Sequence, residues 1–63
     1  MTEQESIDRA YEATVETLFR VFFDAFTSAQ GSAEAEQAAK LRFQHGIVHA
    51  RHVRDLALEL ITK

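Results

Sequence analysis

The chain has 63 residues, ten acidic and seven basic side chains, a net charge of −3 and no cysteine, so disulfide bonds and thiolate metal sites are excluded from this sequence. It has no proline and only two glycines. This leaves little turn chemistry for a β-rich fold, whereas the many Ala, Glu, Leu, Gln and Arg residues favour helix. A chain of this size seldom buries enough apolar surface to be stable without a staple or a partner. We therefore expect an all-α protein that completes its core by pairing with a second copy.

The first predicted helix spans about residues 2–29. It begins with Thr2 and Glu5, whose spacing is typical of a capping box. Apolar residues then recur at steps of four and three, which places them on one stripe of the helix. This stripe consists of Tyr11, Val15, Leu18, Phe22, Ala25 and Ala29. Phe19, Phe23 and Phe26 flank the stripe, so the apolar surface is wider than one short helix can cover.

The predicted turn spans about residues 30–32. Gly31 suits the left-handed backbone that follows a helix end, and Ser32 suits the N-cap of the next helix. Because this connection is short, we expect the two helices to be antiparallel neighbours. Residues equally far from the turn should then meet. The predicted pairs are Leu18 with Phe43, Phe22 with Ala39, Val15 with Gly46 and Tyr11 with Ala50.

The second predicted helix spans about residues 32–62. Its small and apolar residues form a stripe that is predicted to face the first helix. This stripe consists of Ala39, Phe43, Gly46, Ala50, Val53, Ala57 and Leu60. A glycine inside a helix costs about 1 kcal/mol relative to alanine. Close approach of the first helix would compensate for Gly46, and a kink or simple tolerance of the glycine is the alternative.

These elements predict a single domain over residues 1–63, an antiparallel two-helix hairpin that pairs into a four-helix bundle. The charges support the hairpin. Residues 1–36 contain eight acidic and two basic side chains, whereas residues 37–63 contain five basic and two acidic ones. An acidic first helix and a basic second helix would attract each other.

The phenylalanines outside the first stripe indicate a second contact surface. Exposed aromatic patches of this kind tend to be binding sites. The predicted contact residues are Phe19, Phe23, Phe26, Leu41, Val48 and Leu56. The function we expect is a non-enzymatic protein–protein interaction or regulatory module that acts through helical self-association, as a homodimer alone or with a larger protein partner.

Three histidines, His45, His49 and His52, share one side of the second helix. One interpretation is that neutral imidazoles pack in a dimer interface, which acid would loosen because histidine changes charge between about pH 5 and 8. The other is that His45 and His49 bind a divalent metal, with Glu12 or Glu16 as further ligands. The zinc-protease pattern and any Glu-x-x-His motif are missing. No metal or other cofactor is therefore expected, and the histidines are weak candidates.

A third surface is basic. Lys40, Arg51 and Arg54 are predicted on the outer side of the second helix, together with Ile47 and Leu58. This patch suggests a small nucleic-acid-binding regulator as an alternative function. The acidic isoelectric point, near 5.5, disfavours binding that depends on phosphate neutralisation.

The sequence gives no support for an enzyme or a membrane protein. It has no Gly-rich phosphate loop, and a two-helix hairpin offers no deep cleft, so no catalytic residues are expected. No apolar run reaches the roughly 18 residues that a membrane span needs, and the acidic N-terminal segment does not resemble a signal peptide. We therefore expect a cytoplasmic protein without membrane contact.

Overall fold

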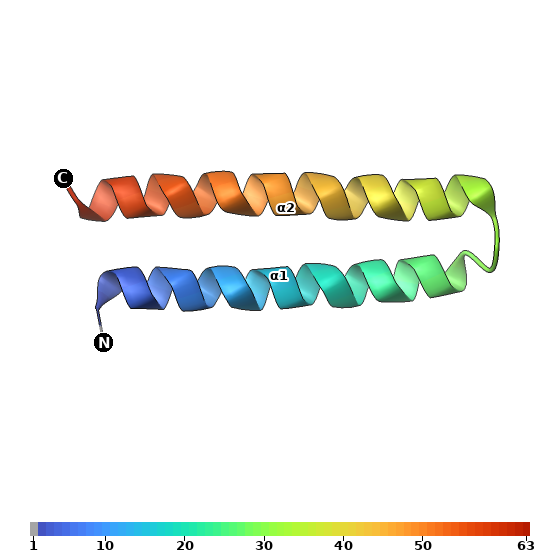
Figure 1. Cartoon of the computed structure of the whole chain (residues 1–63), viewed down its shortest axis with the longest axis horizontal. Helices are drawn as coiled ribbons and strands as arrows, with labels where there is room; N and C mark the ends of the chain where they lie inside the picture. The colour runs from blue at the N-terminus through green and yellow to red at the C-terminus, as the bar shows by residue number, and fades with distance from the viewer. Residues whose placement is uncertain (1) are drawn as a thin grey trace.

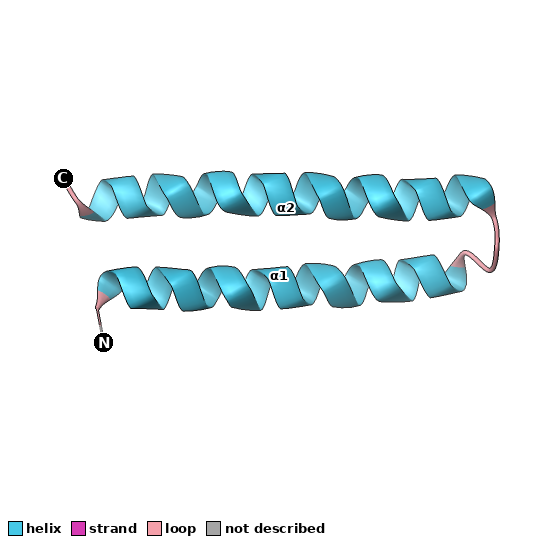
Figure 2. Ribbon diagram, in the orientation of Figure 1, coloured by secondary structure: helices cyan, strands magenta, loops and turns pink. Residues whose placement is uncertain are grey.

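A computed structural model describes residues 2–63 as two long antiparallel helices, so the predicted all-α hairpin is confirmed (Figure 1). Helix α1 spans Glu3–Ser28 and helix α2 spans Ala33–Ile61. All other described residues are caps, turn or chain end (Figure 2). The Cα atoms extend over 47 × 18 × 6 Å, so the hairpin is a slab one helix thick. Residue 1 of the predicted domain lies outside the described residues.

The helix starts follow from capping residues that the sequence marks. The backbone N–H of Glu5 donates to the Thr2 hydroxyl at 3.1 Å, and the N–H of Thr2 donates to the Glu5 carboxylate at 3.4 Å. This reciprocal pair is the predicted capping box. At the start of α2, the N–H of Ala35 donates to the Ser32 hydroxyl at 3.3 Å. Each helix therefore satisfies orphan N–H groups with its own side chains.

The turn uses two residues with positive φ. Gly31 has a φ of 83°, as predicted, and no atom lies within 4 Å of the place where a Cβ atom would stand. Gln30 has a φ of 49°, which its residue type does not predict. Two successive positive φ values reverse the chain between Ala29 and Ser32, so that α2 returns along α1.

The two helices meet near the predicted register, since both members of the predicted pairs Leu18–Phe43 and Phe22–Ala39 line one pocket. Three side-chain contacts reach about one helical turn further along α2. The observed pairs are Leu18 with Gly46, Phe22 with Phe43 and Tyr11 with Arg54. The cause is the tilt of Cα–Cβ bonds toward the N-terminus of every helix. Side chains of α1 therefore lean away from the turn and those of α2 lean toward it. As a result, the Cα atoms of two contacting residues lie at different distances from the turn, with the α2 residue further away.

The C-terminal half of α2 is also rotated relative to the prediction. Val53 and Leu60 were predicted to face α1 but are 48% and 66% exposed. Ala50 and Ala57 of the predicted stripe are half-buried, and so are four residues outside that stripe: Ile47, Arg54, Leu58 and Ile61. A straight helix drifts by about 20° per heptad from a strict seven-residue pattern. Across three heptads this drift moves Val53 and Leu60 off the seam, and it brings Ile47, Arg54 and Leu58 inward from their predicted outer position.

Gly46 marks a close approach of the two helices. A Cβ atom at this position would stand 2.7 Å from Cδ2 of Leu18, shorter than an ordinary van der Waals contact. Of the explanations for a glycine inside the helix, close approach is therefore the one that the structure supports. Leu18 fills the space that a side chain at position 46 would need.

The interior of the hairpin is small. Among the described residues only Ala39 is fully buried, at 4% exposure. Large apolar side chains remain substantially exposed on both helices: Phe19, Val21, Phe23, Leu41, Val48, Val53, Leu56 and Leu60. Neither α1 nor α2 has the length and apolar character needed to cross a membrane. One layer of two helices therefore leaves many large apolar side chains exposed.

Candidate interaction surface

The exposed apolar residues of α1 lie on two different faces of the slab. At about 100° per residue, Phe19 and Phe23 occupy one flank of α1 and Val21 the other. Val21 and Arg42 line the same pocket, of about 80 Å³, so these two residues lie on one face of the hairpin. The opposite face carries Phe19 and Phe23 beside the other flank of α2. We call this second face the aromatic face, and its α2 residues are Lys40, Gln44, Ile47 and Arg51.

Two phenylalanines dominate the aromatic face. The rings of Phe19 and Phe23 lie one turn apart with centroids 6.2 Å apart and an interplanar angle of 41°. They are 55% and 58% exposed. Beside them is an open hollow of about 470 Å³, lined by Val15, Glu16, Phe19, Arg20 and Phe43. The face thus offers both a raised pair of rings and a depression next to it.

Phe26, the third phenylalanine of the predicted contact, packs within the hairpin. Its ring centroid lies 5.7 Å from that of Phe22, which in turn lies 5.0 Å from that of Phe43. Phe26 is half-buried as a result. These three rings connect α1 to α2 in the half of the hairpin that is nearer to the turn.

The α2 part of the predicted contact lies elsewhere. Leu41 and Val48 project from the side of α2 that faces away from α1, and Leu56 lies toward the face that holds Val21. All three are exposed. The two halves of the predicted contact therefore do not share a face. One flat partner laid on Phe19 and Phe23 would leave the α2 residues uncovered.

The histidines lie on the outer side of α2. His45, His49 and His52 line an open hollow of about 460 Å³ together with Gln44 and Val48. The two α1 carboxylates that were considered as metal ligands do not line this hollow. Within residues 2–63, no three His, Cys, Asp or Glu side chains are grouped so that they would hold a metal ion. The imidazoles are exposed in the single hairpin.

The three basic residues of the predicted nucleic-acid surface are not equivalent. Lys40 and Arg51 are exposed on the aromatic face. The guanidinium carbon of Arg54 lies 4.5 Å from the centre of the Tyr11 ring, and Arg54 also forms an ion pair of 3.1 Å with Asp55. Arg54 is half-buried by these contacts and bridges the two helices. Of the three predicted residues, only Lys40 and Arg51 therefore have exposed side chains that could contact a nucleic acid.

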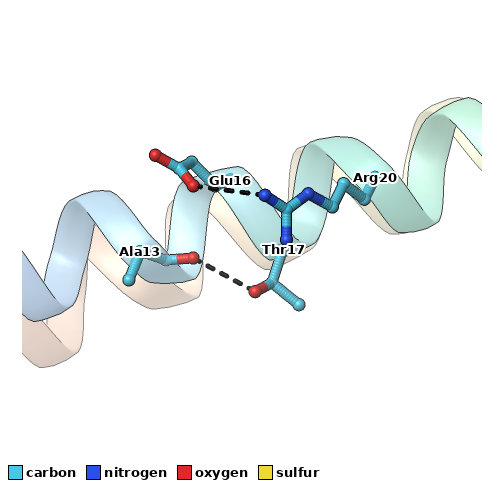
Figure 3. A network of polar contacts seen from close by, with 4 residues as sticks. All are labelled: Ala13, Glu16, Thr17 and Arg20. Atoms are coloured by element: carbon cyan, nitrogen blue, oxygen red, sulfur yellow. Dashed lines mark hydrogen bonds and ion pairs between the residues drawn. The ribbon is translucent and has the colours of Figure 1, made fainter.

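The outer side of α1 is polar and self-contained. Arg20 and Glu16 form an ion pair of 3.5 Å, and the Thr17 hydroxyl donates to the carbonyl oxygen of Ala13 at 3.1 Å (Figure 3). An exposed pair of this kind contributes a few tenths of a kcal/mol. The predicted attraction between the helices does not produce an ion pair between them. Every ion pair in residues 2–63 joins two residues of the same helix or a helix residue and the chain end next to it.

The aromatic face is the strongest candidate for a binding surface. Aromatic side chains are enriched in the cores of protein interfaces, where they contribute much of the binding energy. Comparison of the chain with protein-family models, with curated proteins and with solved structures gives no match. A function is therefore inferred from the surface of the hairpin itself.

Proposed function

We propose that this protein is a non-enzymatic interaction module that assembles with a second copy of itself through the aromatic face. The accessible surface area carries the proposal. The hairpin exposes 4958 Å², whereas a compact monomer of 7.2 kDa exposes about 4,100 Å². The excess of about 860 Å² is close to the roughly 800 Å² that each partner contributes to an interface of standard size.

The shape of the hairpin supports the same proposal. Stable helical domains bury the apolar stripe of each helix between at least two packed layers. The slab has a single layer, 6 Å deep between its Cα atoms. A second hairpin stacked on the aromatic face supplies the missing layer and gives a four-helix bundle.

The phenylalanines supply a substantial share of the association energy. Fully burying a phenylalanine contributes about 1.5–3 kcal/mol, and Phe19 and Phe23 are each a little more than half exposed. Covering the exposed part of each ring therefore contributes about 1 kcal/mol, or about 4 kcal/mol over the four rings of a dimer. A charged side chain in place of either ring removes this term and adds a desolvation cost.

Sedimentation equilibrium of the wild type and two variants tests the proposal. Phe23→Glu places a carboxylate on the aromatic face, next to the ring of Phe19. Val21→Glu is the matched control, because Val21 is 49% exposed on the opposite flank of the same helix. We expect dimers for the wild type and for the control, and a monomer for Phe23→Glu. A wild type that stays monomeric up to millimolar concentration overturns self-association, and a dimer lost only in Val21→Glu overturns the choice of face.

A further inference from the structure

This inference rests on the proposed self-association and concerns how the two hairpins are oriented. Two hairpins stacked through one face are related by a two-fold axis in one of two directions. An axis along the hairpin places both turns at the same end and lays α1 on α2 of the second copy. An axis across the hairpin places the turns at opposite ends and lays like helices on each other. All neighbouring helices are antiparallel in both arrangements.

The charges of the two helices differ enough to separate these arrangements. Helix α1 carries six acidic and two basic side chains, whereas α2 carries four of each. The bases of α2 are concentrated in residues 37–54, which contain no acidic residue: Lys40, Arg42, Arg51 and Arg54. Laying α1 on α1 places like charge on like charge. Laying α1 on α2 pairs an acidic helix with a basic segment.

The arrangement with turns at opposite ends also gives poor contacts on the aromatic face. With the hairpins fully overlapped, Glu12 lies opposite Phe19 of the second copy, and Lys40 lies opposite the region of Arg51 and Arg54. Carboxylates are then buried against apolar rings, and cations meet cations. Sliding the copies until phenylalanines meet requires a shift of about 17 Å, at about 1.5 Å per residue. The hairpin is 47 Å long, so about a third of each face would be uncovered.

Turns at the same end give complementary contacts without any sliding. An axis along the hairpin fixes the heights of both copies, so α1 meets α2 of the second copy in the register seen within one hairpin. Phe19 then lies opposite Ile47 and Gln44 of the second copy, and Glu12 lies opposite its Arg51. Neither Glu12 nor Arg51 forms an ion pair within the part of the chain that the structure describes. Both are exposed on the aromatic face and free for such a contact.

We infer that the dimer is built with both turns at one end, with α1 of each copy packed on α2 of the other. Phe19 and Phe23 form the apolar part of the contact, and Glu12 with Arg51 of the second copy forms a charged pair at each of two symmetric positions. In this arrangement each α1 has only α2 helices as direct neighbours, each α2 has only α1 helices, and the histidine side of α2 stays outside.

A distance measurement between the turns tests the orientation. The chain has no cysteine, so Gln30→Cys, in the exposed turn, accepts a single nitroxide label for double electron–electron resonance. With both turns at one end, the two labels are separated by the distance between helical layers, about 10 Å, plus the label arms, for a total of about 20 Å. With the turns at opposite ends, the separation approaches the 47 Å length of the hairpin for fully overlapped copies and about 30 Å for copies shifted by about 17 Å.

The outcomes separate the orientation from the proposed function. A short distance supports the inference. A distance of about 30 Å or more, which matches opposed hairpins with or without the shift of about 17 Å, overturns the inference while leaving self-association intact. A sample without dipolar coupling that also sediments as a monomer overturns the proposed function itself.

Charge-reversed chains give a second readout that does not use a label. Glu12→Arg and Arg51→Glu each place like charges opposite one another, and we expect each variant alone to dimerise about tenfold more weakly. An equal mixture of the two restores opposite charges only between different chains, so we expect wild-type affinity in the mixture. Leu41→Glu, on the outer side of α2, is the control and should dimerise like the wild type. A mixture that stays as weak as its components overturns the Glu12–Arg51 contact.

Discussion

Leu18 lies so close to Gly46 that a Cβ atom on the glycine would stand 2.7 Å from the leucine Cδ2. This contact sets the distance between the two helices at the middle of the hairpin. It also means that substitution at position 46 has two opposing effects. Alanine raises helix propensity, but it forces Leu18 to move.

We expect Gly46→Ala to be destabilising in the native background and stabilising when Leu18 is shortened. Overpacking against Leu18 lowers the unfolding free energy by about 1–3 kcal/mol. The higher helix propensity of alanine raises it by about 1 kcal/mol relative to glycine. The net loss of unfolding free energy should be about 1 kcal/mol. In a Leu18→Val background, which lacks both Cδ atoms, the same substitution should gain about 1 kcal/mol. Urea unfolding of the four chains at one protein concentration measures this coupling, and additive effects would contradict the close approach.

The contact between Arg54 and Tyr11 should stabilise the hairpin more than any exposed ion pair. A cation over an aromatic ring contributes about 0.5–2 kcal/mol, with the larger values for desolvated pairs. We expect Arg54→Ala to lower the unfolding free energy by about 1 kcal/mol. Arg20→Ala, which removes the exposed pair with Glu16, should change it by less than about 0.5 kcal/mol. Equal effects of the two substitutions would show that the ring contact adds nothing.

The capping box should be a local source of stability at the start of α1. Thr2→Ala removes the hydroxyl that accepts from Glu5, and such a loss costs about 1 kcal/mol. Thr17→Ala is the matched control, because the Thr17 hydroxyl binds the carbonyl oxygen of Ala13 within the helix, and alanine has the higher helix propensity. We expect a lower melting temperature for Thr2→Ala and an unchanged or slightly higher one for Thr17→Ala, measured by circular dichroism.

The proposed self-association would couple folding to dimer formation. Because only Ala39 is fully buried in residues 2–63, the second copy of the proposed dimer would supply a large part of the apolar burial. The melting temperature of the wild type should therefore rise with protein concentration, as expected for a folded dimer in equilibrium with unfolded chains. Phe23→Glu should melt at a lower temperature and without this dependence. A wild-type melting temperature that stays constant over a hundredfold range of concentration would contradict the coupling.

The sequence was sufficient for the fold because the local signals are strong. Thr2, Ser32 and Gly31 each stand at a position that their chemistry favours, and the stripe through Leu18 and Phe22 points inward as predicted. The errors have geometrical causes. A seven-residue repeat does not follow a straight helix of 3.6 residues per turn, so Val53 rotates outward. A pairing rule based on Cα heights ignores the lean of side chains, so it misses contacts that reach one turn further along α2, such as Phe22 with Phe43.

The candidate surface was harder to predict than the fold. The sequence marks Phe19 and Phe23 as surplus apolar residues, and both are exposed. It does not tell which flank of α2 lies beside them, because that depends on the direction in which the turn folds back. Arg54 looks like a surface cation until its register with Tyr11 is known. Combining two separate helical strips into one contact surface was beyond what periodicity alone supports.

The described ends of the hairpin, next to each other and opposite the turn (Figure 1), have a consequence for larger assemblies. In a dimer with both turns at one end, all four chain ends leave the bundle from the other end. Two polypeptides fused to such hairpins would therefore emerge from the same end of the dimer, close to each other. With the turns at opposite ends, the fused polypeptides would instead lie at the two ends of the dimer, about 47 Å apart.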